Sequence, residues 1–231
     1  MFSPSNVMLS CIAMALGVSV SSSVLAGSAS ISGIQGDAAQ FEYNGAMLRI
    51  NAAQNDGYAL LRDGHFYTVG YNNGQPMVFD AGAMLKGFGD MAPQAIHGDL
   101  GAEIISLQDT GKNEVVAGIQ GDVYEIRFVD DSGEERSESL VLSTDKRAQE
   151  FRDAMFQMMD FAETMTPGQA KAKAQSQDIR TRLNSLNAGI LRYGRDMTVT
   201  SINGEAVAAE RFELPAQPLD LQGLGKLFGG Q

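Results

Sequence analysis

The stretch "YALLRDGHFYTVGYNNGQPMVFD" (58–80) decides the fold class, because three apolar runs in it are separated by two tight-turn signals. Asp-Gly at 63–64 and Asn-Gly at 73–74 accept the positive φ angles that two-residue hairpin turns require. The middle run, 65–71, carries apolar side chains at both odd and even positions, so this strand is expected either to be covered on both faces or to line an apolar cavity. The stretch therefore predicts three consecutive antiparallel strands.

The same turn signals recur along the chain and extend the pattern into a larger sheet. Asn-Gly at 44–45, Asp-Ser-Gly at 131–133 and Asn-Gly at 203–204 each separate two apolar or alternating runs. Along 123–129, apolar residues alternate with charged ones, which is typical of a strand with one solvated face. Together these signals predict an antiparallel meander with a hairpin at each turn.

Two helices are expected between the run that follows Asp-Ser-Gly at 131–133 and the run that precedes Asn-Gly at 203–204. Thr144-Asp145 can cap a helix over 145–165, which Thr-Pro-Gly at 166–168 would end. A second helix is predicted over 169–187, and the Gly- and Met-rich stretch 82–95 is interpreted as a short helix or loop. The first helix has one apolar stripe at spacings of three and four, made of Phe151, Met155, Met158, Met159 and Ala162.

The N-terminus reads as a secretory signal peptide, residues 1–26. The first 26 residues contain no charged side chain, and a run of about fourteen apolar residues is followed by Val24-Leu25-Ala26. Cleavage is expected after Ala26, with the periplasm as the destination. The apolar run is shorter than the roughly 20 residues of a membrane span, although an uncleaved anchor is the alternative. Cys11, the one cysteine, lies in this segment, so the cleaved chain has no disulfide.

Composition limits the classes of partner and cofactor. The 231-residue chain is 44% hydrophobic with a formal net charge of −11, which fits one folded domain and disfavours nucleic acid. We expect a single domain over 27–214, a flexible tail over 215–231 and no membrane span after cleavage. The three clustered methionines leave copper(I) binding, plain core and a pocket wall open, with plain core favoured. No metal or other cofactor is predicted.

Reactive constellations are not evident in the sequence. It has no G-x-S-x-G elbow, no phosphate-binding G-x-x-x-x-G-K-[ST] loop and no H-E-x-x-H motif. The two histidines, His65 and His97, follow or precede a glycine in turn-like surroundings, so both are interpreted as exposed and non-catalytic. The sequence therefore predicts a protein that is not an enzyme.

Five segments carry a family resemblance: "NGAMLRIN" (44–51), "LLRDGHFYTVGYNNGQPMVFD" (60–80), "TGKNEVVAGIQGDVYEI" (110–126), "SLVLSTD" (139–145) and "RFELPA" (211–216). They resemble an uncharacterised bacterial exported family that is similar to the lipoprotein carriers LolA and LolB. The resemblance implies an α+β fold: a curved antiparallel sheet, or incomplete barrel, with helices packed on its concave face. It also implies a hairpin that turns at Gly118 to Gly121, and it offers no catalytic residue.

The leading functional prediction is a periplasmic binding protein that holds an acyl chain of a lipid or lipoprotein, or an apolar protein segment, between sheet and helices. The alternative is an envelope structural or interaction protein with a filled core, an envelope protein partner and no small ligand. The residues expected to line the cavity share large apolar side chains on strands and on the first helix. They are Phe66, Tyr67, Val69, Tyr71, Met77, Phe79, Tyr124, Ile126, Phe128, Met155 and Met159.

Overall fold

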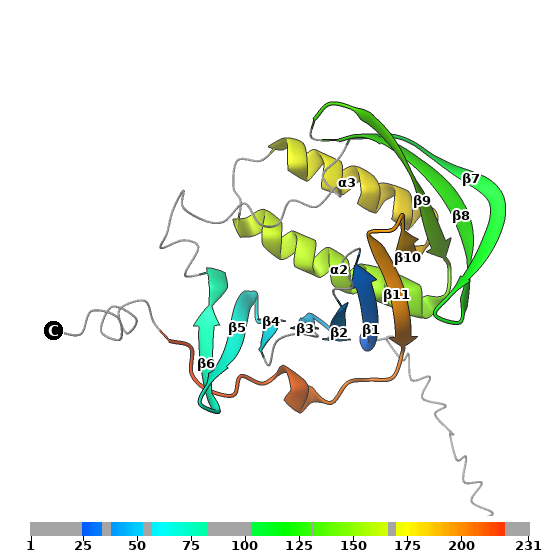
Figure 1. The fold of residues 1–231 in the computed structure, drawn as a ribbon. Coiled ribbons are helices and arrows are strands. Elements are labelled where there is room, and N and C mark those ends of the chain that lie inside the picture. The colour runs from blue at the N-terminus through cyan, green and yellow to red at the C-terminus, as the bar shows by residue number, and fades with distance from the viewer. Residues whose placement is uncertain are drawn as a thin grey trace, which may run out of the picture.

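The computed structural model describes residues 25–33, 38–52, 57–82, 103–130, 132–165 and 170–219. Most of them belong to one antiparallel sheet that bends around two helices (Figure 1). The strands before the helices are β1 (Ala26–Gly33), β2 (Ala38–Asn44), β3 (Met47–Ala52), β4 (Tyr58–Arg62), β5 (His65–Asn72), β6 (Gln75–Asp80), β7 (Glu103–Val116), β8 (Ile119–Val129) and β9 (Glu135–Ser143). They are followed by α2 (Lys146–Met165), α3 (Ala170–Ser185), β10 (Gly189–Tyr193), β11 (Met197–Asn203) and the short 3-10 helix η3 (Ala209–Phe212).

The sheet consists of two meanders joined at its centre. The eleven strands lie in the order β6-β5-β4-β3-β2-β1-β11-β10-β9-β8-β7, so β6 and β7 are its edges and the sheet is open. The first meander runs from β1 to β6 and the second from β7 to β11, with both helices inserted between β9 and β10. The antiparallel pairing of β1 with β11 connects the two meanders. The prediction of a large antiparallel sheet with helices is confirmed.

Four of the expected hairpins form where the turn residues stand. Asp63 and Asn73 have φ angles of 51° and 50°, and the glycine that follows each of them also has a positive φ angle, as tight hairpin turns require. Gly45 and Gly133 have positive φ angles of 59° and 85° in the β2–β3 and β8–β9 turns. The β7–β8 hairpin turns at Ala117 and Gly118, whereas Gly121 lies inside β8.

The prediction of a fifth hairpin, at Asn203-Gly204, is wrong. Asn203 ends β11, and residues 204–219 leave the sheet as an irregular segment with the single turn of η3; we call this segment the arm. Asn203 does not form a two-residue turn, because its side-chain oxygen accepts the backbone N–H of Glu205 and directs the chain away from β11. The short, weakly apolar run after Gly204 has no free strand beside β11, since β1 and β10 occupy both of its edges.

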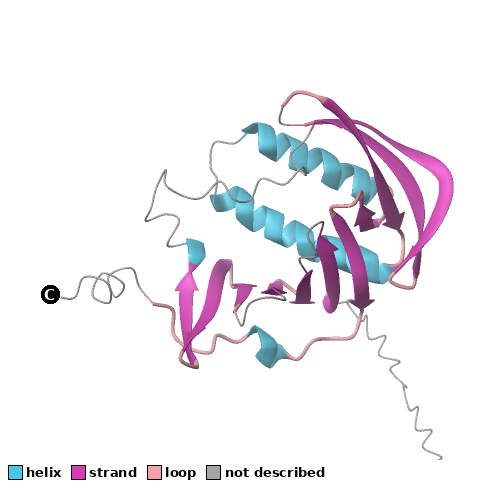
Figure 2. Cartoon of the chain, in the orientation of Figure 1, coloured by secondary structure: helices cyan, strands magenta, loops and turns pink. Residues whose placement is uncertain are grey.

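Both helices lie on one side of the sheet, as Figure 2 shows by the separation of helical and strand ribbons. Lys146 begins α2 one residue after Asp145, whose carboxylate accepts the backbone N–H of Arg147 at 2.9 Å and thereby caps the helix. The stripe of α2 packs into the main core, in which Phe151 contacts Phe41 edge-to-face and stacks on Tyr43. A second core cluster joins Ile179 and Leu183 of α3 to strands β8 and β9.

A third cluster lies on the face of β3 to β6 that is turned away from α2, which we call the outer face. Tyr58, Leu60, Val69 and Val78 are buried there together with Phe212 of the arm. The backbone N–H of Leu219 also donates to the carbonyl of Val78 at 2.8 Å, beside edge strand β6. The tail expected from residue 215 therefore begins as part of the packed arm, and residues 220–231 lie outside the described residues.

Three other expectations also fall partly or wholly outside the described residues. These are most of the signal segment 1–26, nearly all of the stretch 82–95, and His97. The expected cleavage after Ala26 falls one residue inside β1, which begins at Ala26.

Candidate functional site

The exposure of apolar side chains changes along α2. In its first half, Ala148, Phe151 and Ala154 are fully buried in the main core, with exposed fractions of at most 1%. From Met155 to Phe161, five large apolar side chains are only partly buried. We call this set the α2 apolar surface: Met155, Phe156, Met158, Met159 and Phe161.

The way α2 crosses the sheet explains this difference. At its first turn, the helix lies so close to β10 that a Cβ atom on Gly189 would lie 2.0 Å from the carbonyl oxygen of Ala148. Farther along, the side-chain amide of Gln157 donates to the carbonyl of Gly45 in the β2–β3 turn. Phe161 then stacks on Phe66 of β5, with ring centroids 5.4 Å apart. The second half of α2 thus extends over the first meander, from the β2–β3 turn to β5.

Helix α3 borders the opposite side of the α2 apolar surface. Phe156 and Met159 pack against the cluster that contains Ile179 and Leu183 of α3. The guanidinium of Arg180 lies over the ring of Phe156, 4.9 Å from its centroid, and forms an ion pair with Asp160 at 2.6 Å. These contacts pair the charges at the edge of the surface and fix α3 against α2.

The structure divides the predicted cavity residues between two faces of the sheet. Phe66, Met155 and Met159 belong to the clusters around α2, and Tyr124, Ile126 and Phe128 pack in the cluster that contains α3. Met77 and Phe79 lie on the helix side by register, because Phe79 pairs with Thr68 and Met77 with Gly70, in phase with Phe66. The other three, Tyr67, Val69 and Tyr71, lie on the outer face; Tyr67 and Val69 pack in the cluster beneath the arm, and Tyr71 is 47% exposed.

Phe156, Met158 and Phe161 are part of the α2 apolar surface but were not among the predicted cavity residues. Met158 and Phe161 follow Phe151 at helical spacings of seven and ten, so the periodicity contains a signal for both. Phe156 lies off the main stripe and faces α3, and only the packing of the two helices reveals its place.

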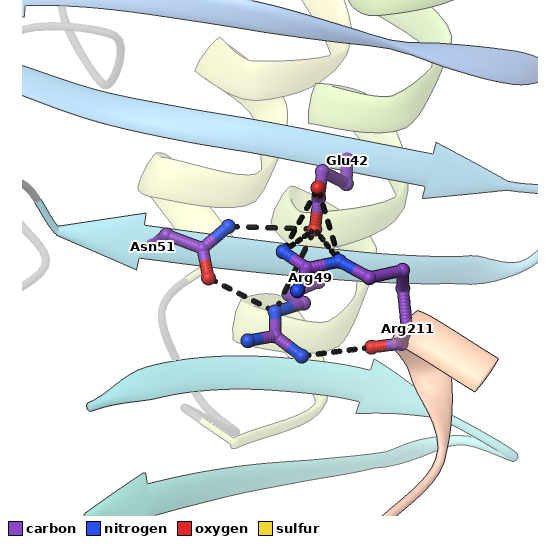
Figure 3. Close-up of polar contacts among 4 residues, drawn as sticks. All are labelled: Glu42, Arg49, Asn51 and Arg211. Atoms are coloured by element: carbon purple, nitrogen blue, oxygen red, sulfur yellow. Dashed lines mark hydrogen bonds and ion pairs between the residues drawn. The ribbon is translucent and has the colours of Figure 1, made fainter. Parts of the chain in front are cut away.

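A second feature, a polar cluster around the buried carboxylate of Glu42, lies on the outer face (Figure 3). Glu42 of β2 is only 8% exposed, and its carboxylate accepts hydrogen bonds from Nε and Nη2 of Arg211 in the arm. Arg49 of β3 lies 3.6 Å from the same carboxylate, and Asn51 donates to it at 3.4 Å. The register of the β2–β3 hairpin places Glu42 opposite Arg49. The Asn-Gly turn in the sequence therefore predicts this pair, although it does not predict the contact with Arg211.

Arg49 connects this cluster to the aromatic part of the outer face. Its guanidinium lies 3.4 Å from the ring centroid of Tyr58, and its Nη1 donates to the carbonyl of Arg211 at 3.0 Å. Burial lowers the pKa of Arg49, with the nearby charge of Arg211 acting in the same direction, and burial raises the pKa of Tyr58. Both groups keep their usual ionisation near neutral pH, so the arrangement acts as an ionic anchor for the arm.

The histidine of the opening stretch has a structural partner. Nδ1 of His65 lies 2.8 Å from a carboxylate oxygen of Asp80 on the neighbouring strand, and its ring stacks on Tyr67. The imidazole is exposed at the strand end. Among the described residues, no group of three or more His, Cys, Asp or Glu side chains is placed to hold a metal ion.

Comparisons with known proteins add no relative to these observations. No protein-family model matches the chain, and neither a curated protein nor a solved structure matches it significantly. Within the described residues, no helix combines the length and apolar character that crossing a membrane requires.

Proposed function

We propose that the protein binds an apolar chain, such as a lipid acyl chain or an apolar protein segment, on the α2 apolar surface after export to the periplasm. The observation that carries the proposal is the contrast along α2. Phe151 is 1% exposed, whereas every large apolar side chain from Met155 to Phe161 remains partly accessible.

The chemistry of these side chains supports an adaptable apolar contact. Methionine has three rotatable bonds and a polarisable thioether, so Met155, Met158 and Met159 can follow the shape of a flexible chain. Phe66 and Phe161 stack against each other and present a rigid aromatic border. Covering such a surface contributes about 25 cal/mol per Å² of apolar area, so an acyl chain could bind without a charged contact.

Titration of the delipidated full-length protein with a fluorescent fatty acid tests the proposal. We expect saturable binding by the natural protein and at least about tenfold weaker binding by Met158→Glu, which introduces a charge among apolar groups. Thr164→Glu is the matched control, because it adds the same charge at an exposed position of the same helix. Its affinity should equal that of the natural protein.

Two results would contradict the proposal. One is the absence of saturable binding to a protein whose circular dichroism and thermal transition show that it is folded. The other is equal affinity of the Met158→Glu and Thr164→Glu variants, because binding would then not involve the α2 apolar surface.

The second candidate function is an envelope interaction protein with a filled interior. The complete burial of Tyr43, Leu48, Phe151 and Leu191 around the first half of α2 favours it. In that case fatty acid would not bind, and pull-down of an envelope partner would depend on the protein surface. Removing residues 217–231 and repeating the pull-down tests whether the C-terminal end supplies that surface.

A further inference from the structure

Part of the contact between the arm and the outer face is made by the backbone of the arm. The side-chain amide of Asn44 donates to the carbonyl of Val207 at 3.2 Å, and Nη1 of Arg62 donates to the carbonyl of Phe212 at 2.8 Å. Arg49 donates to the carbonyl of Arg211 in the same way. Three side chains of the sheet thus bind the arm at Val207 and at the 3-10 turn η3 through carbonyl groups, which every peptide carries.

Two side chains of the arm give this contact its selectivity. Phe212 is fully buried, with 0% exposure, among Tyr58, Leu60, Val69 and Val78. Arg211, the residue before it, donates to both carboxylate oxygens of Glu42 through Nε and Nη2. The outer face of β2 to β6 therefore fits a segment with one 3-10 helical turn in which an arginine directly precedes a large aromatic residue.

The connection between the arm and the sheet is exposed. Residues 204–206, which follow Asn203, the last paired position of β11, are all exposed to solvent. The described hydrogen bonds of this connection are local ones between Asn203 and Glu205. The arm can therefore separate from the outer face without breaking the strand pairing of β11.

We infer that the outer face of β2 to β6 is a segment-binding surface that the chain fills with its own arm, and that the arm of a second copy can replace it. A second copy carries the same Arg211-Phe212 pair and the same carbonyl groups, so an exchanged arm makes the same contacts. Reciprocal exchange gives a closed two-fold dimer. This inference concerns the face opposite to the α2 apolar surface and does not depend on the proposed function.

A labelled synthetic peptide of residues 204–219 tests the surface in the full-length protein. In the Phe212→Ala chain, where the arm is weakened, we expect saturable binding of the natural peptide. A peptide that itself carries Phe212→Ala should bind at least about tenfold more weakly. The natural chain should also bind weakly, since its own arm competes at an effective concentration of about millimolar. Arg211→Ala provides a second chain with a weakened arm, should Phe212→Ala fail to fold.

Exchange between copies is tested with a disulfide. Phe79 and Leu219 are partners in a parallel bridge, a spacing of about 5 Å between Cα atoms that a disulfide can span. When the Cys11→Ser, Phe79→Cys, Leu219→Cys chain is refolded at low protein concentration, we expect an intramolecular disulfide, which gives monomers. Covalent dimers should increase with protein concentration, above the background of the two single-cysteine variants.

Each part of the inference can fail separately. If a folded chain with a weakened arm does not bind the natural peptide, or binds the Phe212→Ala peptide equally well, the segment-binding surface is refuted. If the double-cysteine chain forms only the intramolecular disulfide at every protein concentration, exchange between copies is refuted.

Discussion

The guanidinium of Arg211 and the carboxylate of Glu42 are 169 positions apart in sequence, and their closest hydrogen bond measures 2.8 Å. This contact attaches the arm to β2, near the middle of the sheet. The carboxylate is buried, and Arg49 and Asn51 complete its surroundings. The neighbouring Phe212 is the apolar part of the same attachment.

Removing the Phe212 ring should lower the stability of the whole domain. Phe212→Ala leaves a cavity beneath the arm, and we expect the free energy of unfolding to fall by about 3–5 kcal/mol. Phe161→Ala is the matched comparison, because Phe161 is only partly buried and should lose about half as much. Urea denaturation of both variants measures this difference; equal losses would show that the arm contributes little to stability.

Gly189→Ala should disrupt the packing of α2 on β10. The added Cβ atom would lie 2.0 Å from the backbone oxygen of Ala148, and backbone atoms cannot rotate away as a side chain does. We expect a loss of about 3 kcal/mol or failure to fold. Gly70→Ala, in open space within β5, is the control. Thermal transitions of the two variants should differ clearly, and similar transitions would contradict the close contact.

Tyr43→Phe should leave stability unchanged or raise it. The Tyr43 hydroxyl is buried and has no hydrogen-bond partner among the described residues, and burial holds the pKa of this phenol above its usual range. Removing an unpaired buried hydroxyl can recover about 1–3 kcal/mol of desolvation cost. Tyr71→Phe, at a 47% exposed position, serves as the neutral comparison in the same denaturation experiment. A destabilised Tyr43→Phe protein would point to an undetected partner of the hydroxyl.

The cap of α2 should make stability depend on acid pH. The side-chain hydrogen bond from Arg147 holds the pKa of Asp145 below its usual range of about 3.9. A carboxyl group whose pKa is lower in the folded than in the unfolded protein stabilises the folded state at pH values above its unfolded pKa. This stabilisation is lost as the pH falls toward the folded pKa. In Asp145→Asn, the decrease in unfolding free energy between about pH 5 and pH 2 should therefore be smaller than in the natural protein. Parallel pH profiles would refute this role.

Export should yield a mature chain that begins at Gly27, which intact mass measurement of the secreted protein will show. Processing there removes Leu25, whose carbonyl accepts the N–H of Gly45 at 2.7 Å and whose side chain packs against the main core. A chain beginning at Gly27 should accordingly be about 1 kcal/mol less stable than one beginning at Leu25. A secreted mass that retains the first 24 residues would contradict cleavage.

The sequence by itself determined the local features of this protein. Asp63-Gly64 and Asn73-Gly74 specify their hairpins because the positive φ angles of a two-residue turn depend only on the residues in the turn. Apolar residues at both odd and even positions of 65–71 indicated a strand with two apolar faces, and Phe66 and Val69 do pack in clusters on opposite faces of the sheet. The helical spacing from Phe151 likewise indicated a common stripe, and Phe151, Met155 and Met158 pack together in the main core. Each of these signals lies within about twenty consecutive residues.

Only the tertiary structure decided how these local pieces meet. The pairing of β1 with β11, the burial of Phe212 and the contact of Arg211 with Glu42 join segments more than 130 residues apart. Apolar residues at both odd and even positions indicate that a strand has two apolar faces, but they do not show which face meets a helix and which meets the arm. For that reason Tyr67 and Val69 were placed with Phe66 in one predicted cavity, although the sheet separates them. The partial exposure of Met155 to Phe161 likewise follows from where α2 crosses the sheet, a property that no single segment contains.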